Sequence, residues 1–242
     1  FALFGALGGI LARHPDEAAA RRLFLELGVA AGPERDAVIE AAGRARLPSV
    51  VSLLARAATS PDIDDRRSVA SVLAAHAGST EALTVLRKLA SDHDASVRAE
   101  ATFALGAVGD PSLYASLASM ARAGDLEVAT NAAAAIARIA RRAPPGAGAP
   151  ASAPGDVVCP MLSDGRPTVR ANALSAMAAL GRRCGDGAAE RRLLVEDPSE
   201  LVRGAAARAI AGGASPEDRA ARDRCASGDR SAARSATAQG GE

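Results

Sequence analysis

The sequence predicts an all-α protein, an α-solenoid of about six helical hairpins that form a curved superhelix. A short segment, clearest from Val97 to Gly106, recurs along the 242-residue chain. No alternating strand pattern separates its copies, and alanine, the best helix former, occurs 62 times. Such a repeat is typical of stacked helical pairs, each burying its apolar face against the next pair.

The repeats align on an arginine. Successive copies lie 32, 31, 31, 41 and 33 residues apart. They fall at Arg35, Arg67, Arg98, Ala129, Arg170 and Arg203. Only the fourth copy lacks the arginine, so the stacked repeats are expected to carry the other five as a structural ladder.

Basic and acidic residues nearly balance in this chain. It has 29 of the first, 28 of the second and a net charge of +1. Charges of both signs are dispersed, so no global field attracts nucleic acid or an acidic membrane. Lys88 is the only lysine, and we interpret this excess of arginine as a bacterial-like, high-GC composition.

The residues that precede the first repeat, 1–32, are expected to form capping helices. The apolar stretch from Phe1 to Ala12 is too short to cross a bilayer, which requires about 20 residues. No transmembrane segment is therefore predicted. The compartment stays open, with the cytoplasm slightly favoured over an exported or periplasmic location.

The third repeat shows how each hairpin is built. Apolar residues share one face of a predicted first helix at 82–89, a turn follows at 91–94, and a second helix is predicted over 96–108. Gly109 and Pro111 then end that helix and start the next one. Hairpins of this kind are predicted over 33–142 and 156–226, the latter range ending in a C-terminal helix.

The second helix of this repeat carries a specific motif. Its residues are Asp94, Val97, Arg98, Ala101, Ala104, Leu105 and Gly106. They resemble, residue for residue, the short HEAT-like repeats first described in phycobilisome lyases, with the pattern Asp-x-x-Val-Arg-x-x-Ala-x-x-Ala-Leu-Gly. The resemblance covers about residues 33–213. Asp164 and Asp197 stand five residues before their valine instead of three, which predicts a different turn in those repeats.

The resemblance implies that the arginines tie adjacent repeats together by pairing with aspartates of the turns. Candidate partners are Asp62, Asp64, Asp94 and Asp197. The alternative is a ladder that tracks the phosphates of a nucleic acid. We favour the structural role, because acids accompany the arginines and the aromatic platforms of single-strand binders are missing.

The long spacing between the fourth and fifth copies comes from an insertion rich in proline, glycine and alanine at 143–155. Such a composition cannot continue a helix. We interpret it as an exposed loop, with a hinge between a four-repeat and a two-repeat module as the alternative. The tail at 227–242 has no apolar periodicity and is expected to be disordered.

Chemistry-bearing residues are sparse. The three histidines, His14, His76 and His93, fall at unrelated repeat positions, so we expect no metal site. We also expect no cofactor and no catalytic residue, because no phosphate loop or nucleophile motif occurs.

Cys159 and Cys184 flank the two ends of the fifth hairpin, where they could form a disulfide. Two reduced cysteines are favoured, because the odd Cys225 remains.

The second helices are expected to line the concave side, and the residues two and five places after the ladder position to face a partner. Phe103 is the apolar anchor of this predicted surface, and two equivalent asparagines could bond an extended backbone. The surface comprises Glu40, Glu100, Phe103, Asn131, Asn172, Ser175 and Arg208, together with Val69, Val72, Ala134 and Ala205. The alternative is that Phe103 belongs to the core and the asparagines are solvated.

These patterns predict a non-enzymatic helical-repeat scaffold or adaptor that binds another protein through its concave surface. The alternative is a bilin-lyase-like subunit or chaperone that handles a tetrapyrrole and its acceptor protein, although aromatic residues are only 2% of the chain. Nucleic-acid binding is a weaker third hypothesis. The sequence does not indicate the oligomeric state.

Overall fold

A computed structural model describes residues 2–16, 18, 20, 22, 33–45, 47–122, 125–143, 157–213 and 215–228. Within these ranges the chain forms twelve α-helices and two short 3-10 helices, and it contains no strand. The predicted all-α fold is confirmed. Most of the insertion at 143–155, most of the tail at 227–242 and much of 17–32 lie outside the described residues.

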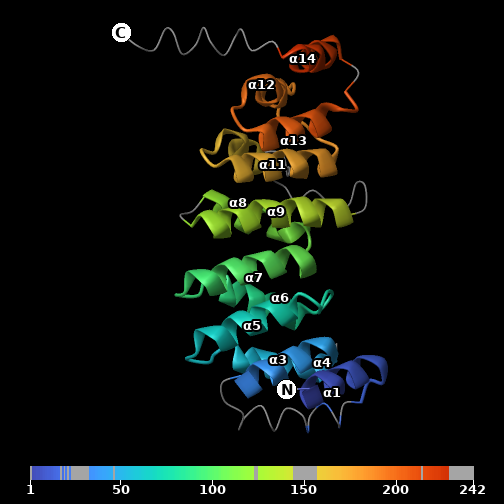
Figure 1. Cartoon of the computed structure of the whole chain (residues 1–242), viewed down its shortest axis with the longest axis vertical. Coiled ribbons are helices and arrows are strands. Elements are labelled where there is room, and N and C mark those ends of the chain that lie inside the picture. Colours follow the sequence, from blue (N-terminus) through green and yellow to red (C-terminus); the bar gives the residue numbers. More distant parts are fainter. Residues whose placement is uncertain are drawn as a thin grey trace. The chain divides into compact units, whose positions relative to one another are not determined.

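The chain divides into two compact units, unit 1 from Phe1 to Asp110 and unit 2 from Pro111 to Glu242. In unit 1 one row of helices packs in the order α1, α3, α5, α7, and the helices α4 and α6 pack against this row (Figure 1). The bounds are α1 Ala2–Arg13, α3 Pro33–Ala45, α4 Pro48–Ala57, α5 Ile63–Leu73, α6 Thr80–Leu89 and α7 Ala95–Val108. The second helices of the repeats therefore stack directly on one another.

Unit 2 follows the same scheme, with α9, α11 and α13 as its row of second helices. The first helices here are α8, which follows the short helix η1, and α12, and the 3-10 helix η2 precedes α11 in the fifth repeat. The bounds are η1 Pro111–Leu113, α8 Tyr114–Arg122, α9 Leu126–Arg142, η2 Cys159–Ser163, α11 Pro167–Leu180, α12 Ala188–Glu196, α13 Glu200–Ile210 and α14 Pro216–Ser227. The last of these, α14, packs on α12.

Local signals in the turns start and end the second helices. The side chain of Asp62 accepts the N–H of Asp64, and that of Asp94 accepts the N–H of Ser96, so each carboxylate satisfies a helix N-terminus. Helix α11 starts with a proline at its first turn and ends at Gly181, whose φ of 62° is left-handed. The turn chemistry therefore sets the boundaries of these helices.

Small residues let the helices of unit 1 approach closely. A Cβ added at Gly8 would lie 2.7 Å from the Cα of Ala41, and one added at Gly43 would overlap the side chain of Val72. The backbones of α1, α3 and α5 therefore pack at separations that larger side chains would prevent. Helices this close bury little apolar area each, so each repeat depends on its neighbours.

The helices on either side of the insertion belong to the same unit. Helices α9 and α11 pack directly on each other, the hydroxyls of Thr130 and Thr168 are 3.0 Å apart, and Asn172 donates its amide N–H to the carbonyl of Thr130 over 3.2 Å. The boundary between compact units lies at Asp110 and Pro111, and whether 143–155 is a loop or a hinge stays a prediction.

A disulfide joins Cys159 in η2 to Cys184, which follows α11, with their Cα atoms 5.6 Å apart. The structure therefore contains this bond and not the reduced pair that the odd cysteine count favoured. Cys225 remains a free thiol. Because η2 spans only five residues, it buries little area beyond Met161 and Leu162, and the covalent bond holds it to the end of α11.

Reduction of the disulfide should lower the free energy of unfolding of unit 2 by about 3 kcal/mol, because the bond closes a loop with a sequence separation of 25 residues. The measurement is urea unfolding of the whole chain with and without reductant. Cys225→Ser is the matched control, and it should respond to reductant like the natural chain. Titration of three free thiols in the unreduced protein would show that the bond does not form.

Candidate functional site

Arginines of three second helices hold the turns of their own repeats. Each donates Nη1 to the backbone carbonyls six and five residues earlier. The distances are 2.8 and 2.8 Å for Arg98, 2.8 and 3.1 Å for Arg170, and 2.8 and 3.0 Å for Arg203. The guanidinium thus satisfies carbonyls between the two helices of a hairpin, which would otherwise require water.

In the second repeat the equivalent residue is Arg66, not Arg67 as the repeat spacing predicted. Arg66 donates Nη1 to the carbonyls of Ser60 and Pro61 at 2.9 and 3.1 Å. Arg67 instead forms an exposed ion pair with Asp64 of its own helix at 2.9 Å. The reason is the cap: Arg66 lies four residues after the N-cap Asp62, as Arg98 lies four residues after its N-cap Asp94.

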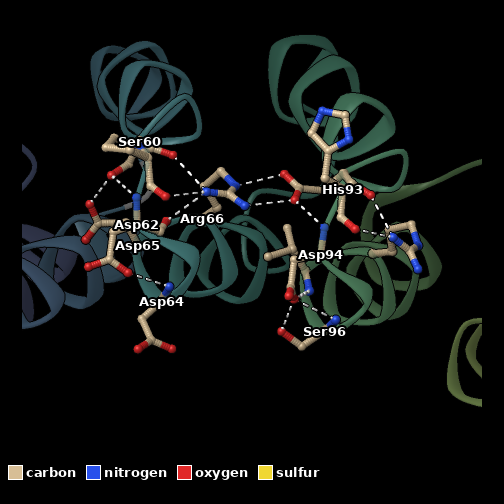
Figure 2. A network of polar contacts seen from close by, with 12 residues as sticks. Ser60, Asp62, Asp64, Asp65, Arg66, His93, Asp94 and Ser96 are labelled. Atoms are coloured by element: carbon tan, nitrogen blue, oxygen red, sulfur yellow. Dashed lines mark hydrogen bonds and ion pairs between the residues drawn. The ribbon is translucent and has the colours of Figure 1, made fainter.

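Two of these arginines also bond the next repeat. Arg66 donates Nε and Nη2 to the two carboxylate oxygens of Asp92 at 2.8 and 2.9 Å. Figure 2 shows Arg66 between the turn at Ser60 and the turn that contains His93 and Asp94. Arg170 contacts Asp197 in the same bidentate way, at 2.8 and 2.9 Å. Two parallel hydrogen bonds from one planar guanidinium to both oxygens of a carboxylate are the strongest geometry for such an ion pair.

The aspartate of each pair also shapes its own turn. Asp92 accepts the N–H of Asp94 at 3.0 Å, and Asp197 accepts the N–H of Ser199 at 2.9 Å. Asp164 does the same for Arg166 at 2.9 Å. All three aspartates stand six residues before a ladder arginine, so Asp92, and not Asp94, is the equivalent of Asp164 and Asp197. The expected difference between these turns is therefore wrong, and the Asp-x5-Arg spacing was the signal that sequence reasoning missed.

The repeat with Ala129 in place of the arginine has a different connection. Arg166, from the turn of the following repeat, donates Nη2 to the carbonyl of Ala121 near the end of α8 over 2.6 Å. Its Nε and Nη2 also bond both carboxylate oxygens of Asp164, at 2.8 and 2.7 Å. Arg166 therefore links the fourth and fifth repeats where the usual arginine is missing.

The first predicted ladder residue, Arg35, forms an ion pair with Asp65 at 2.6 Å. It reaches from α3 to α5, and so it also connects neighbouring repeats. Asp65 is buried and accepts a hydrogen bond from the hydroxyl of Ser60 as well. Of the turn acids proposed from sequence, Asp197 pairs between repeats and Asp64 within one helix, while Asp62 and Asp94 serve as N-caps.

The ion pairs shift the pKa of their acids. The hydrogen bond from Arg66 lowers the pKa of Asp92, against the opposing effect of burial, and the hydrogen bond from Arg166 lowers that of Asp164. For Asp218, burial raises the pKa, but the hydrogen bonds and charge of Arg183 outweigh it and the net shift is downward. Asp36 differs, because burial and the nearby charge of Asp65 raise its pKa.

An open groove lies in unit 1, on the face formed by its second helices. It has a volume of about 1000 Å³. Helix α1 and the three second helices α3, α5 and α7 all contribute to its wall. The lining residues are Gly9, Ala12, Arg13, Glu40, Gly43, Arg44, Arg67, Ser68, Ser71, Val72, Ala74, Ala75 and Glu100. Small side chains make most of this surface, and charged side chains are distributed over it.

Three residues proposed as partner contacts, Glu40, Val72 and Glu100, line this groove. Val69 is buried, because the register of α5 is one residue earlier than predicted, and Ser68 and Ser71 occupy the groove positions instead. Phe103, one turn after Glu100, is 45% exposed, so it does not belong to the core.

The other proposed contacts belong to unit 2, and two of them already form hydrogen bonds within that unit. Asn172 bonds the carbonyl of Thr130, and the hydroxyl of Ser175 bonds the carbonyl of Ala171 at 3.0 Å. Asn131 and Ala134 are half-buried, Ala205 is buried and Arg208 is exposed. The side-chain N–H of Asn172 therefore joins α11 to α9. The side-chain oxygen of Asn172 takes no part in this hydrogen bond.

The described part of the chain holds no group of three or more His, Cys, Asp or Glu side chains close enough to share a metal ion. His14 and His93 are exposed, and His76 is buried. Among the helices described above, none has both the length and the apolar character to cross a bilayer.

Removal of a buried ladder arginine should destabilise the protein strongly. Arg170→Ala leaves Asp197 buried without its cation, and we expect a loss of about 3 kcal/mol in the free energy of unfolding. In unit 1, Arg66→Ala should also be destabilising, whereas its neighbour Arg67→Ala removes only an exposed pair and should cost at most about 0.5 kcal/mol. Urea unfolding measures all three, and equal stability of the two unit-1 variants would contradict the assigned register.

The pair of Arg66 and Asp92 should make stability depend on acidic pH. The pKa of Asp92 in the folded protein lies below its ordinary value of 3.8, so its stabilising effect is complete above that value. The effect is lost as the pH falls through the ordinary value towards the lowered one. The difference in unfolding free energy between the natural chain and Arg66→Ala should therefore shrink from pH 6 to pH 2, two values chosen to bracket the transition. A constant difference would show that the pair does not titrate in this way.

Comparison with known proteins supports the assignment of these repeats. Residues 50–138 match the HEAT repeats family. No curated protein sequence is significantly similar to the chain.

Solved structures give a similar picture of the fold. An engineered protein is similar with a TM-score of 0.54 and 24% identity, over 90% of this chain and 97% of the other. A designed armadillo repeat protein in complex with the peptide (KR)4 is similar with a TM-score of 0.52 and 19% identity, over 86% and 98% of the two chains. At these identities the likeness concerns the fold alone. The matched residues, the hairpins of both units and the turn-binding arginines of α5, α7, α11 and α13 show that this chain contains HEAT-like repeats.

Proposed function

We propose that this protein is a non-enzymatic scaffold or adaptor that binds a segment of another protein in the groove of unit 1. The observation that carries the proposal is the groove itself, an open channel of about 1000 Å³ that crosses four helices. Its length along the stack suits an extended polypeptide, which can contact several repeats in turn.

The surface of the groove supports a polypeptide partner. Gly9, Ala12, Ala74 and Ala75 present no long side chains, so the backbone of a bound segment can approach the helices. The exposed hydroxyl of Ser71 lies at the centre of the groove, where it can pair with polar groups of that backbone. The hydroxyl of Ser68 beside it already donates to the carboxylate of Asp36 over 3.4 Å.

The lining gives no support to the tetrapyrrole alternative. Ligand pockets for large planar molecules are lined mainly by apolar and aromatic side chains. Among the residues that line this groove, none is aromatic and none is histidine or cysteine. Charged and small residues predominate instead.

A bulky side chain in the groove should block binding. Ser71 is exposed on α5 and lines the groove, so Ser71→Trp should fill its centre without disturbing the core. Proteins captured from cell extract by the natural chain, identified by mass spectrometry, should bind this variant at least about tenfold more weakly.

The matched control is Thr84→Trp, an exposed position of α6 outside the groove. It should retain the same proteins, and circular dichroism should show equal helix content for both variants. Equal binding by Ser71→Trp and the natural chain would place the partner site elsewhere on the molecule.

A further inference from the structure

The two ends of the unit-1 groove carry unpaired charges of opposite sign. Arg13 lies at the end of α1, and Glu100 lies on α7. Among the described residues, neither side chain has a hydrogen bond or ion-pair partner. The guanidinium of Arg13 folds back along α1, because its Nη1 lies 3.7 Å from the position that a Cβ of Gly9 would take. Both charges are therefore part of the groove surface.

The helices between these two ends carry balanced charges. On α3, Arg44 contacts Glu40 at 3.5 Å, and both side chains line the groove. On α5, Arg67 is paired with Asp64 at 2.9 Å. The unpaired charge of the groove thus changes from positive at α1 to negative at α7.

We infer that the groove selects an extended peptide segment with charges of both signs, an acidic side chain that pairs with Arg13 and a basic side chain that pairs with Glu100. The inference rests on the function proposed above and defines its partner. Three helix spacings of about 9 Å separate α1 from α7, and an extended chain advances about 3.3 Å per residue. The two charged residues of the segment therefore lie about eight positions apart.

Segments with a single sign of charge fit less well. A wholly acidic peptide, like a nucleic acid, would bring negative charge to Glu100, and a wholly basic peptide would bring positive charge to Arg13. In both cases one end of the groove would repel the ligand, and such repulsion is a common source of specificity. Charge complementarity over the full groove requires both signs in one segment.

The test is selection of random 16-residue peptides on the whole chain, followed by affinity measurements on synthetic copies. Enriched sequences should carry an acidic and a basic residue about eight positions apart. Arg13→Glu/Glu100→Arg, which keeps the net charge, should bind these peptides at least about tenfold more weakly. It should also prefer copies in which the two charges are exchanged.

The control variant Lys88→Glu/Glu127→Arg makes the same exchange at two exposed positions that do not line the groove, and it should bind like the natural chain. Enriched peptides that Ser71→Trp fails to bind, but that lack the paired charges, would overturn the inference and leave the proposed function standing. Absence of any peptide whose binding depends on Ser71 would count against the proposed function, and the inference would fall with it.

Discussion

The bond between an arginine of one repeat and an aspartate of the next is the interaction on which the stacking depends. Helices rich in alanine bury little area against each other, so neighbouring repeats need a second source of attraction and of register. The fork of Arg170 on Asp197 is nearly enclosed, with side chains only 10% and 3% exposed. Because Arg66 and Arg170 also hold the turns of their own repeats, the same groups fix these two hairpins internally and join them to their neighbours.

Irregular repeats keep their connections by other means. Where Ala129 replaces the arginine, Arg166 reaches back from the next turn, and in the fifth repeat a disulfide holds η2 to the end of α11. A chain in which stability passes from neighbour to neighbour cannot leave one interface weak, because each repeat depends on the adjacent interfaces. The fourth and fifth repeats are therefore stabilised by different chemistry at an equivalent place.

The small residues that permit tight stacking also shape the groove that we propose as a binding site. Gly43 lets α3 approach α5, and the same scarcity of large side chains leaves an open, shallow groove in unit 1. Such a surface leaves room for the backbone of a ligand to approach the helices, and its charges are far apart. It does not form an enclosed apolar pocket. It supports the proposed recognition of a polypeptide by charge and shape.

The sequence by itself determined the all-α repeat fold, because the period, the caps and the alanine content are local properties of the chain. It also identified Arg98, Arg170 and Arg203, which follow valine at a constant spacing. It could not determine that Arg66 and not Arg67 takes this position, because the N-cap of α5 sets the phase. Only the tertiary structure decided that Asp92 pairs with Arg66, that Cys159 bonds Cys184, and that Arg13 and Glu100 share one groove. These contacts join residues far apart in the chain, and their geometry depends on how closely whole helices pack.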